Sequence, residues 1–363
     1  MKTYAKGVTV TPQLVNAAIE LWKTKEAGRK NRWRIYSEFG NADDLANLIA
    51  SEVDSRSLYF SPLKTKQRVD GYSGKTRDIG IEPIKQQICG YVIELAVKPL
   101  IDARTGFWQV SRAGIGQHSL AKAAARWASE CTYAVHCDVR KCYDSIKCDT
   151  VMKILRKYVK SADVLYVAEQ ILRAYPGGHL MIGSFFSMRM AHLVLSFGYH
   201  FIEEQHVERR GKLVKMVEHQ GWYADDVFLF GKSKKNLKTA VKRLQRYMLE
   251  EFGLEFKPWK IVRIRDGEPV DVAGYVVRRN RVTVRAKIFR RARRAFFRFR
   301  AKNKNLRLAY RVVSYFGWIK NANSKTFVKR HGIRTILRRA KMCVSAEQRK
   351  RRCVYVNCQD RGC

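Results

Sequence analysis

The sequence predicts an α+β fold, and three observations lead to this class. Segments with helical spacing of apolar residues are interspersed with short apolar runs of strand length. Hydrophobic residues make up 46% of the chain and aromatic residues 11%, which is enough for a core and argues against disorder. No internal repeat or low-complexity linker interrupts the 363 residues, so we expect one continuous unit of two or three packed subdomains.

The expected elements follow from this periodicity in chain order. The first half should contain mainly helices over 12–55, a β-hairpin within 56–85, a helix over 84–101, a strand over 133–139 and a helix over 150–158. The second half should contain a helix over 191–204, strands over 213–218 and 227–230, a helix over 235–252, and two strands within 270–284. Turn signals at Gly71-Tyr72-Ser73-Gly74 and Arg279-Asn280-Arg281 lie in the two predicted hairpins.

The charge of the chain predicts a polyanionic partner. Lysine and arginine total 72 against 32 acidic residues, which gives a net charge of +40. A membrane surface is the rival polyanion, but the chain has no stretch of about 20 apolar residues and no signal-peptide core near its N-terminus. Nucleic acid is therefore the preferred partner, without membrane contact. The basic residues gather after residue 285, interleaved with aromatic residues, and we place a domain boundary there.

The nine cysteines do not form the pattern of a secreted disulfide framework, so we expect a reducing cytoplasm. Four of them lie near the C-terminus, at Cys343, Cys353, Cys358 and Cys363. Their spacing lacks a Cys-x-x-Cys pair, which favours incidental thiols over a zinc site but leaves both readings open.

Carboxylates at the ends of predicted strands suggest a metal site. Asp138 ends one strand candidate, and Tyr223-Ala224-Asp225-Asp226 lies between two others. Mg²⁺ prefers carboxylate oxygens, and nucleotide polymerisation needs two divalent ions roughly 3.5–4 Å apart. We therefore predict a metal site formed by Asp138, Val139, Asp225 and Asp226. An Asp-Asp pair alone is common on solvated turns, so the prediction depends on the neighbouring motifs.

Those motifs resemble the reverse transcriptases. Asp138 followed by Tyr143 is similar to the first metal motif of that family, and further matching blocks follow in the family's order over residues 60–325. The resemblance implies a right-hand polymerase with fingers, an antiparallel palm with helices, and a helical thumb. It also implies an RNA-directed DNA polymerase that uses an RNA template, a DNA or RNA primer, deoxynucleotides and two Mg²⁺ ions, with Mn²⁺ as an alternative.

On this resemblance we divide the chain into an N-terminal region with fingers (1–130), a palm (131–284, with part of the fingers near 150–178), a basic thumb (285–345) and a basic tail (346–363). Several residues receive expected roles by position in the family's motifs. Tyr143 would exclude a 2′ hydroxyl, although a core tyrosine is the alternative. Lys75 and Arg77, within Gly74-Lys75-Thr76-Arg77, would grip the triphosphate, although a solvated arginine is the alternative.

Three further blocks complete the resemblance. Gly183 would let the backbone approach the nascent base pair, with Ile182 beside the nucleotide. Lys260, in Phe256-Lys257-Pro258-Trp259-Lys260, would protonate or neutralise the leaving pyrophosphate as a catalytic residue, although it could be an ordinary surface lysine. Gly274 and Tyr275 resemble the primer grip.

Departures from the common motif indicate a subtype. The usual Gln before the glycine is Ile182, and the usual Pro after the serine is Met188. Ile182 resembles the diversity-generating retroelement enzymes, which implies error-prone cDNA synthesis with a structured non-coding RNA and a small accessory protein oligomer, in a bacterial or phage-infected cell. Met188 departs from them, so a phage-defence or retron-like reverse transcriptase is the runner-up. Two less favoured hypotheses are an RNA polymerase or primase, and a non-catalytic RNA-binding protein like a maturase.

Overall fold

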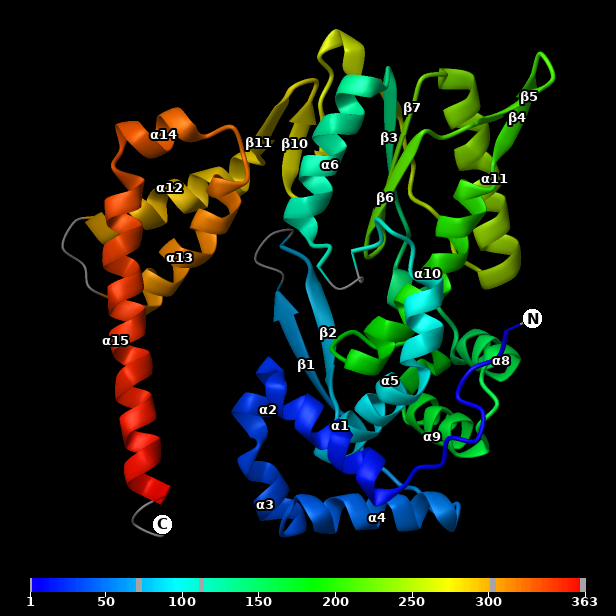
Figure 1. The fold of residues 1–363 in the computed structure, drawn as a ribbon, viewed down its shortest axis with the longest axis vertical. Coiled ribbons are helices and arrows are strands. Elements are labelled where there is room, and N and C mark those ends of the chain that lie inside the picture. Colours follow the sequence, from blue (N-terminus) through cyan, green and yellow to red (C-terminus); the bar gives the residue numbers. More distant parts are fainter. Residues whose placement is uncertain (1, 70–73, 111–113, 301–304, 360–363) are drawn as a thin grey trace.

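The computed structural model describes residues 2–69, 74–110, 114–300 and 305–359. Helices and antiparallel sheets alternate along the chain (Figure 1), so the predicted α+β class is confirmed. Within these ranges, no helix combines the length and the apolar character needed to cross a membrane.

Five helices form the N-terminal layer: α1 (Pro12–Thr24), α2 (Glu26–Asn31), α3 (Trp33–Phe39), α4 (Ala42–Asp54) and α5 (Ile84–Arg104). The Thr11 hydroxyl accepts a hydrogen bond from the Leu14 amide and so caps α1. Gly28 lets α2 fold back onto the end of α1, because a Cβ there would lie 2.0 Å from the carbonyl oxygen of Trp22. The helical prediction for 12–55 is thereby confirmed as four short helices.

A β-hairpin separates α4 from α5, as predicted. Its strands, β1 (Lys64–Val69) and β2 (Thr76–Ile81), pair in antiparallel register. The residues of β1 are exposed along its whole length, so this hairpin projects from the helical layer. The turn signal at 71–73 lies outside the described residues.

The central sheet has the strand order β6-β7-β3-β8, and every neighbouring pair is antiparallel. Its strands are β3 (Tyr133–Asp138), β6 (His219–Tyr223), β7 (Asp226–Gly231) and β8 (Ile261–Arg263). Alternate residues of β3 and β7 enter two different cores: Val135 and Leu229 join one, and Ala134 and Phe230 join the other. Burial on both faces explains why these two strands appear in the sequence as mostly apolar runs, interrupted in β3 by His136.

Helices cover both faces of this sheet. One core includes residues of α8 (Cys148–Tyr158), α9 (Ala162–Arg173), α10 (Phe185–Glu203) and α11 (Lys234–Phe252), with the short helices α7 (Cys142–Ser145) and η1 (Pro176–Gly178) nearby in the chain. The other core contains α6 (Gln117–Glu130), the 3-10 turn η2 (Ile264–Asp266), a second sheet and the C-terminal helices.

The prediction that a strand over 213–218 leads into the Asp-Asp turn is wrong. The first three of those residues belong to β5 (Lys212–Lys215), which pairs with β4 (His206–Arg209) in a separate exposed hairpin. The strand that enters the turn is β6, whose polar composition hides it. Gln220 is nevertheless buried, because its amide donates to the Tyr199 carbonyl and its oxygen accepts from the Trp222 indole.

Residues 270–284 form three strands where two were expected. The second sheet has the order β11-β10-β9, with β9 (Val270–Val272), β10 (Tyr275–Arg278) and β11 (Arg281–Val284). Ala273 and Gly274 have positive φ angles of 47° and 91°, which ends β9 and turns the chain into β10.

Four helices follow: α12 (Ala286–Arg300), α13 (Leu306–Lys320), α14 (Lys325–Arg330) and α15 (Ile333–Gln359). Helix α15 passes through residue 346 without a break, so no element ends where the sequence suggested a separate tail. Of the four C-terminal cysteines, Cys343 is half-buried with a free thiol. Cys353 and Cys358 lie within the range of α15, and Cys363 lies outside the described residues.

Candidate active site

The predicted carboxylates come together where β3, β6 and β7 meet. Tyr223 pairs with Asp226, which leaves Ala224 and Asp225 as a two-residue turn between β6 and β7. Ala224 adopts the left-handed region, with φ 51°, a conformation that the tight turn imposes on a residue with a Cβ. In the neighbouring pair of strands, Asp138 lies opposite Asp226. The strand register therefore brings all three aspartates to one end of the sheet.

Backbone hydrogen bonds fix this end of the sheet. The Val139 amide donates to the Asp225 carbonyl at 3.1 Å, and the Lys257 amide donates to the Asp138 carbonyl at 2.8 Å. The segment after α11 is thus tied to the end of β3. This explains how Lys257, which we did not single out from the sequence, reaches the aspartates.

The side chains show the electrostatic cost of placing the carboxylates together. Burial raises the pKa of the Asp225 carboxyl, and the negative charges of Asp226 and Asp138 raise it further. Oδ1 of Asp138 is buried and has no hydrogen-bond partner, and the Lys257 ammonium forms an ion pair with it at 2.5 Å. A carboxylate oxygen in that state, beside two like charges, fits a bound cation.

Asp226 has a different partner. Nε2 of His136 lies 2.7 Å from Oδ1 of Asp226, and the imidazole ring stacks on Phe228 at a centroid distance of 4.8 Å. Across the part of the chain that the structure describes, no three His, Cys, Asp or Glu side chains converge closely enough to form a complete metal centre. The aspartates are therefore neighbours in register, with donor chemistry that suits a divalent ion, but their oxygens do not meet at one point.

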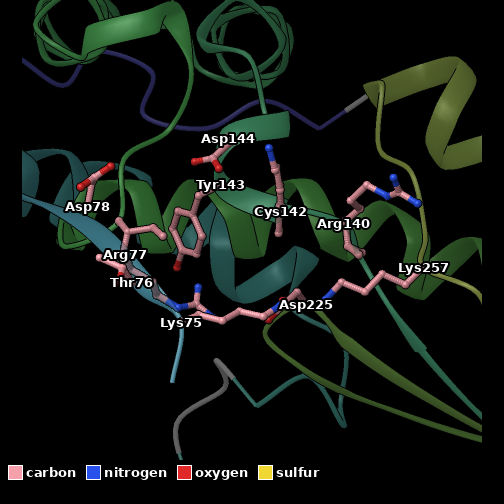
Figure 2. A pocket seen from close by; sticks show the side chains of 13 residues that line it. Lys75, Thr76, Arg77, Asp78, Arg140, Cys142, Tyr143, Asp144, Asp225 and Lys257 are labelled. Atoms are coloured by element: carbon pink, nitrogen blue, oxygen red, sulfur yellow. The ribbon is translucent and has the colours of Figure 1, made fainter. Parts of the chain in front are cut away.

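A cavity of about 660 Å³ opens beside Asp225 (Figure 2). It is lined by Lys75, Thr76, Arg77, Asp78, Val139, Arg140, Lys141, Cys142, Tyr143, Asp144, Ile182, Asp225 and Lys257. Figure 2 shows Arg77 and Tyr143 on one side and Arg140 and Lys257 on the other. The cavity thus joins six of the predicted residues, which are Lys75, Arg77, Val139, Tyr143, Ile182 and Asp225.

Tyr143 lies on α7, a short helix that begins directly after Lys141. The φ of 44° at Lys141 turns the chain from β3 into this helix. Burial raises the pKa of its phenol to about 12, so the hydroxyl remains protonated. The ring is half-buried and forms part of the cavity wall.

The hairpin of β1 and β2, called here the fingers hairpin, carries like charges opposite each other. Arg68 of β1 pairs with Arg77 of β2, so their side chains leave the same face of the ribbon. Opposed like charges destabilise a hairpin, and a polyanion between them removes that repulsion. Arg68 was not predicted, and the alternation of Lys64, Lys66 and Arg68 along β1 was the signal for it.

Gly183 makes a close backbone approach, but its partner is protein. Its φ is +109°, and a Cβ there would lie 2.5 Å from the carbonyl oxygen of Gly80 in β2. The Gly80 amide donates to the Ile182 carbonyl at 2.8 Å. This glycine therefore closes the segment before α10 against the fingers hairpin, and the approach of its backbone to the nascent base pair stays a prediction.

A buried polar network lies below this junction and was missed in the sequence. The Tyr175 hydroxyl donates to Oε1 of Glu82 at 2.9 Å and lies 2.7 Å from the Ser184 hydroxyl. Burial raises the pKa of Glu82. Glutamate and tyrosine far apart in the sequence give no motif, so only the fold reveals them.

Asp138 and Asp226 adjoin Asp225 at the end of the sheet without lining the cavity, and three further predicted residues, Lys260, Gly274 and Tyr275, do not line it either. Lys260 is exposed and does not line it, whereas Lys257 of the same motif does. Tyr275 is fully buried, and its hydroxyl lies 2.6 Å from Nδ1 of His118. A Cβ on Gly274 would lie 2.7 Å from the Trp318 ring of α13. Gly274 and Tyr275 thus form a joint between the second sheet and α13, and their contact with a primer stays a prediction.

Comparisons with known proteins place the chain in a family. The family model for reverse transcriptase (RNA-dependent DNA polymerase) matches residues 64–277, more than half of the chain. No curated protein matches the sequence. Among solved structures, apo telomerase from Candida tropicalis is similar with a TM-score of 0.47 and 10% identity, over 79% of this chain and 62% of that one.

A second telomerase structure, truncated from its C-terminal domain, gives a TM-score of 0.43 and 12% identity, over 62% of this chain and 55% of that one. The chain therefore spans less than two thirds of either telomerase chain. The family match, the antiparallel central sheet and the helices on both of its faces are those of a right-hand polymerase. The chain belongs to the reverse transcriptase (RNA-dependent DNA polymerase) family.

Proposed function

We propose that this enzyme copies RNA into DNA by a two-metal mechanism at the cavity beside Asp225. Asp138, Asp225 and Asp226, with the backbone of Val139, would hold two Mg²⁺ ions. Ions bound there would supply activation of the primer 3′ hydroxyl and neutralisation of the triphosphate charge. The observation that carries the proposal is the single cavity in which Asp225, Tyr143 and the fingers cations face one another.

The protein side chains bind and orient the nucleotide. Arg77 and Lys75 supply positive donors for the triphosphate from the fingers side. Lys257 supplies a cation from the opposite side, and we assign to it the neutralisation of the leaving group that the motif suggested for Lys260. Tyr143 occupies the wall of the cavity, where a rigid ring would exclude the 2′ hydroxyl of a ribonucleotide.

The test removes one carboxylate charge without changing its shape. Asp225→Asn should lower the rate of deoxynucleotide addition on an RNA template by about a thousandfold. Asp149→Asn, an exposed aspartate on α8, is the matched control and should leave the rate unchanged. Mg²⁺ should raise the melting temperature of the wild type and not of the Asp225 variant, because the ion relieves repulsion among the aspartates. Full activity of Asp225→Asn would exclude the metal site.

We further propose that the enzyme performs error-prone cDNA synthesis in a diversity-generating retroelement, with a structured non-coding RNA and a small accessory protein as partners. Ile182 supports this, because an aliphatic side chain lines the cavity where the family pattern has a hydrogen-bonding one. Misincorporation should concentrate opposite template adenines, and Ile182→Gln should reduce it. Uniformly faithful copying by the wild type would contradict this role.

A phage-defence or retron-like role is the second candidate. Met188, in place of proline, favours it, and so does Ala224, because alanine at this place in the metal turn is commoner in the groups other than the diversity-generating enzymes. The neighbouring genome separates the two roles, because paired template and variable repeats accompany diversification and not defence.

A further inference from the structure

Two aromatic rings stand on the solvent side of the N-terminal layer, away from the cavity. Trp33 is 62% exposed and Tyr36 is 60% exposed, although both residue types are usually largely buried. Spaced three residues apart on α3, they lie on one face of the helix. The opposite face is anchored, because Ile35 is fully buried in the core. The exposure of the rings is therefore set by the helix and not by loose packing.

Positive charge surrounds the two rings. Residues 23–36 contain six lysines and arginines and one acidic residue, Glu26. Arg32, between α2 and α3, keeps right-handed helical dihedrals of φ −56° and ψ −31°, so the outward face continues from one helix into the other. Arg29 therefore precedes Trp33 by four residues on that face, and both are exposed.

Gly28 and Ile35 hold this surface in place. Gly28 allows α2 to lie against the carbonyl of Trp22, and Ile35 packs α3 into the core. In Figure 1, α2 and α3 lie on the side of the helical layer that is turned toward α15. The surface is thus a fixed part of the fold, separate from the residues that line the nucleotide cavity.

We propose that this surface, formed by Arg29, Lys30, Trp33 and Tyr36 and called here the α2–α3 surface, binds unpaired RNA outside the polymerase cavity. Exposed aromatic rings stack on bases of any sequence, and neighbouring cations track the phosphates. A lipid surface would need a broader apolar face than two rings beside several full charges. Single-stranded RNA matches both features, and the choice of RNA rests on the proposed function, in which the enzyme copies an RNA strand.

The central experiment measures binding of a fluorescently labelled, unstructured RNA of about 30 nucleotides by anisotropy. The double variant Trp33→Ala/Tyr36→Ala should bind it about tenfold more weakly, because two stacking platforms are lost. Trp33→Phe/Tyr36→Phe should stay within about threefold of the wild type, because the rings remain. Phe107→Ala, a 54% exposed aromatic residue elsewhere, is the matched control and should bind as the wild type.

Two further readouts keep the result interpretable. Trp33→Leu/Tyr36→Leu retains apolar bulk and should lose affinity as the alanine variant does, even if the alanine variant folds poorly. Arg29→Ala/Lys30→Ala should reduce the slope of log affinity against log salt by about 1.4, or about 0.7 for each phosphate contact. The proposal would be overturned if the leucine variant bound the RNA with wild-type affinity. It would also be overturned if that variant lost binding to phosphatidylglycerol vesicles while its RNA binding stayed intact.

Extension assays distinguish the source of the RNA. If the template itself occupies the surface, a long template tail should lower the KM for primer–template, and the alanine variant should lose this advantage. If a second RNA occupies the α2–α3 surface, the template tail should not change the KM for primer–template. Free RNA should still bind less tightly to the alanine variant than to the wild type. Polymerisation on a short template is measured in the same assay, so failure of this proposal is distinct from failure of the metal site.

Discussion

The junction between Gly183 and the fingers hairpin allows a sharp test of how the nucleotide cavity is built. Gly183→Ala places a methyl group 2.5 Å from the Gly80 carbonyl oxygen, about 0.9 Å inside ordinary contact distance. The residue also keeps a φ of +109°, which costs an L side chain about 1–2 kcal/mol. Forcing the methyl group against backbone adds about 1–3 kcal/mol.

These contributions predict a free energy of unfolding lower by about 2–5 kcal/mol. With an unfolding entropy of about 2.1 cal/mol/K per residue over 363 residues, the melting temperature should fall by about 3–7 °C. The hairpin that carries Arg77 should shift by most of an ångström, and kcat/KM for deoxynucleotides should fall by about tenfold to a hundredfold.

Gly253→Ala is the matched control. This glycine ends α11 with φ 68°, and no atom lies within 4 Å of a Cβ placed there. It should lower the melting temperature by only about 1–3 °C through backbone strain, and leave kcat/KM unchanged. Differential scanning fluorimetry and steady-state extension on an RNA template give both quantities. If the two variants behave alike in stability and in kcat/KM, the junction does not position the fingers and the reasoning fails.

Two other predictions concern the walls of the cavity. Tyr143→Ala should lower the preference for deoxynucleotides over ribonucleotides by about a hundredfold, or ~2.7 kcal/mol, measured as the ratio of the two kcat/KM values; an unchanged ratio would show that the ring is only part of the core. Lys257→Met should lower kcat by about tenfold or more while changing stability by less than about 1 kcal/mol, because the side chains of the Lys257–Asp138 pair are 43% and 28% exposed. Lys260→Met should leave kcat within about twofold, and the reverse order of effects would restore Lys260 as the leaving-group residue.

The strands that hold the aspartates were predictable because they are buried on both faces. Val227 to Phe230 forms an unbroken apolar run after Asp226, and Asp138 ends a run that only His136 interrupts, so these two carboxylates could be placed from the sequence. The third strand, β6, was not predictable. Gln220 is satisfied by partners distant in the sequence, and Gly221 is needed because a Cβ would lie 2.3 Å from Leu120. Neither requirement leaves a local pattern.

The site was predictable only to the level of motifs. Lys257 and Lys260 belong to one five-residue segment without helical or strand periodicity, so the sequence does not say which lysine faces the aspartates. That choice depends on the hydrogen bond from the Lys257 amide to the Asp138 carbonyl. The Glu82–Tyr175 pair depends in the same way on two segments that meet only after folding.

The contact between Gly274 and Trp318 has a mechanical consequence for the thumb. Helix α13, which carries Trp318, packs against α15, and α15 has 27 residues and so is about 40 Å long. A rotation of about 10° about this contact would move the far end of α15 by about 7 Å, if α13 and α15 turn together. The contact thus acts as a pivot, and because Gly274 has no side chain, Trp318 packs closely there and determines the position of the far end of α15.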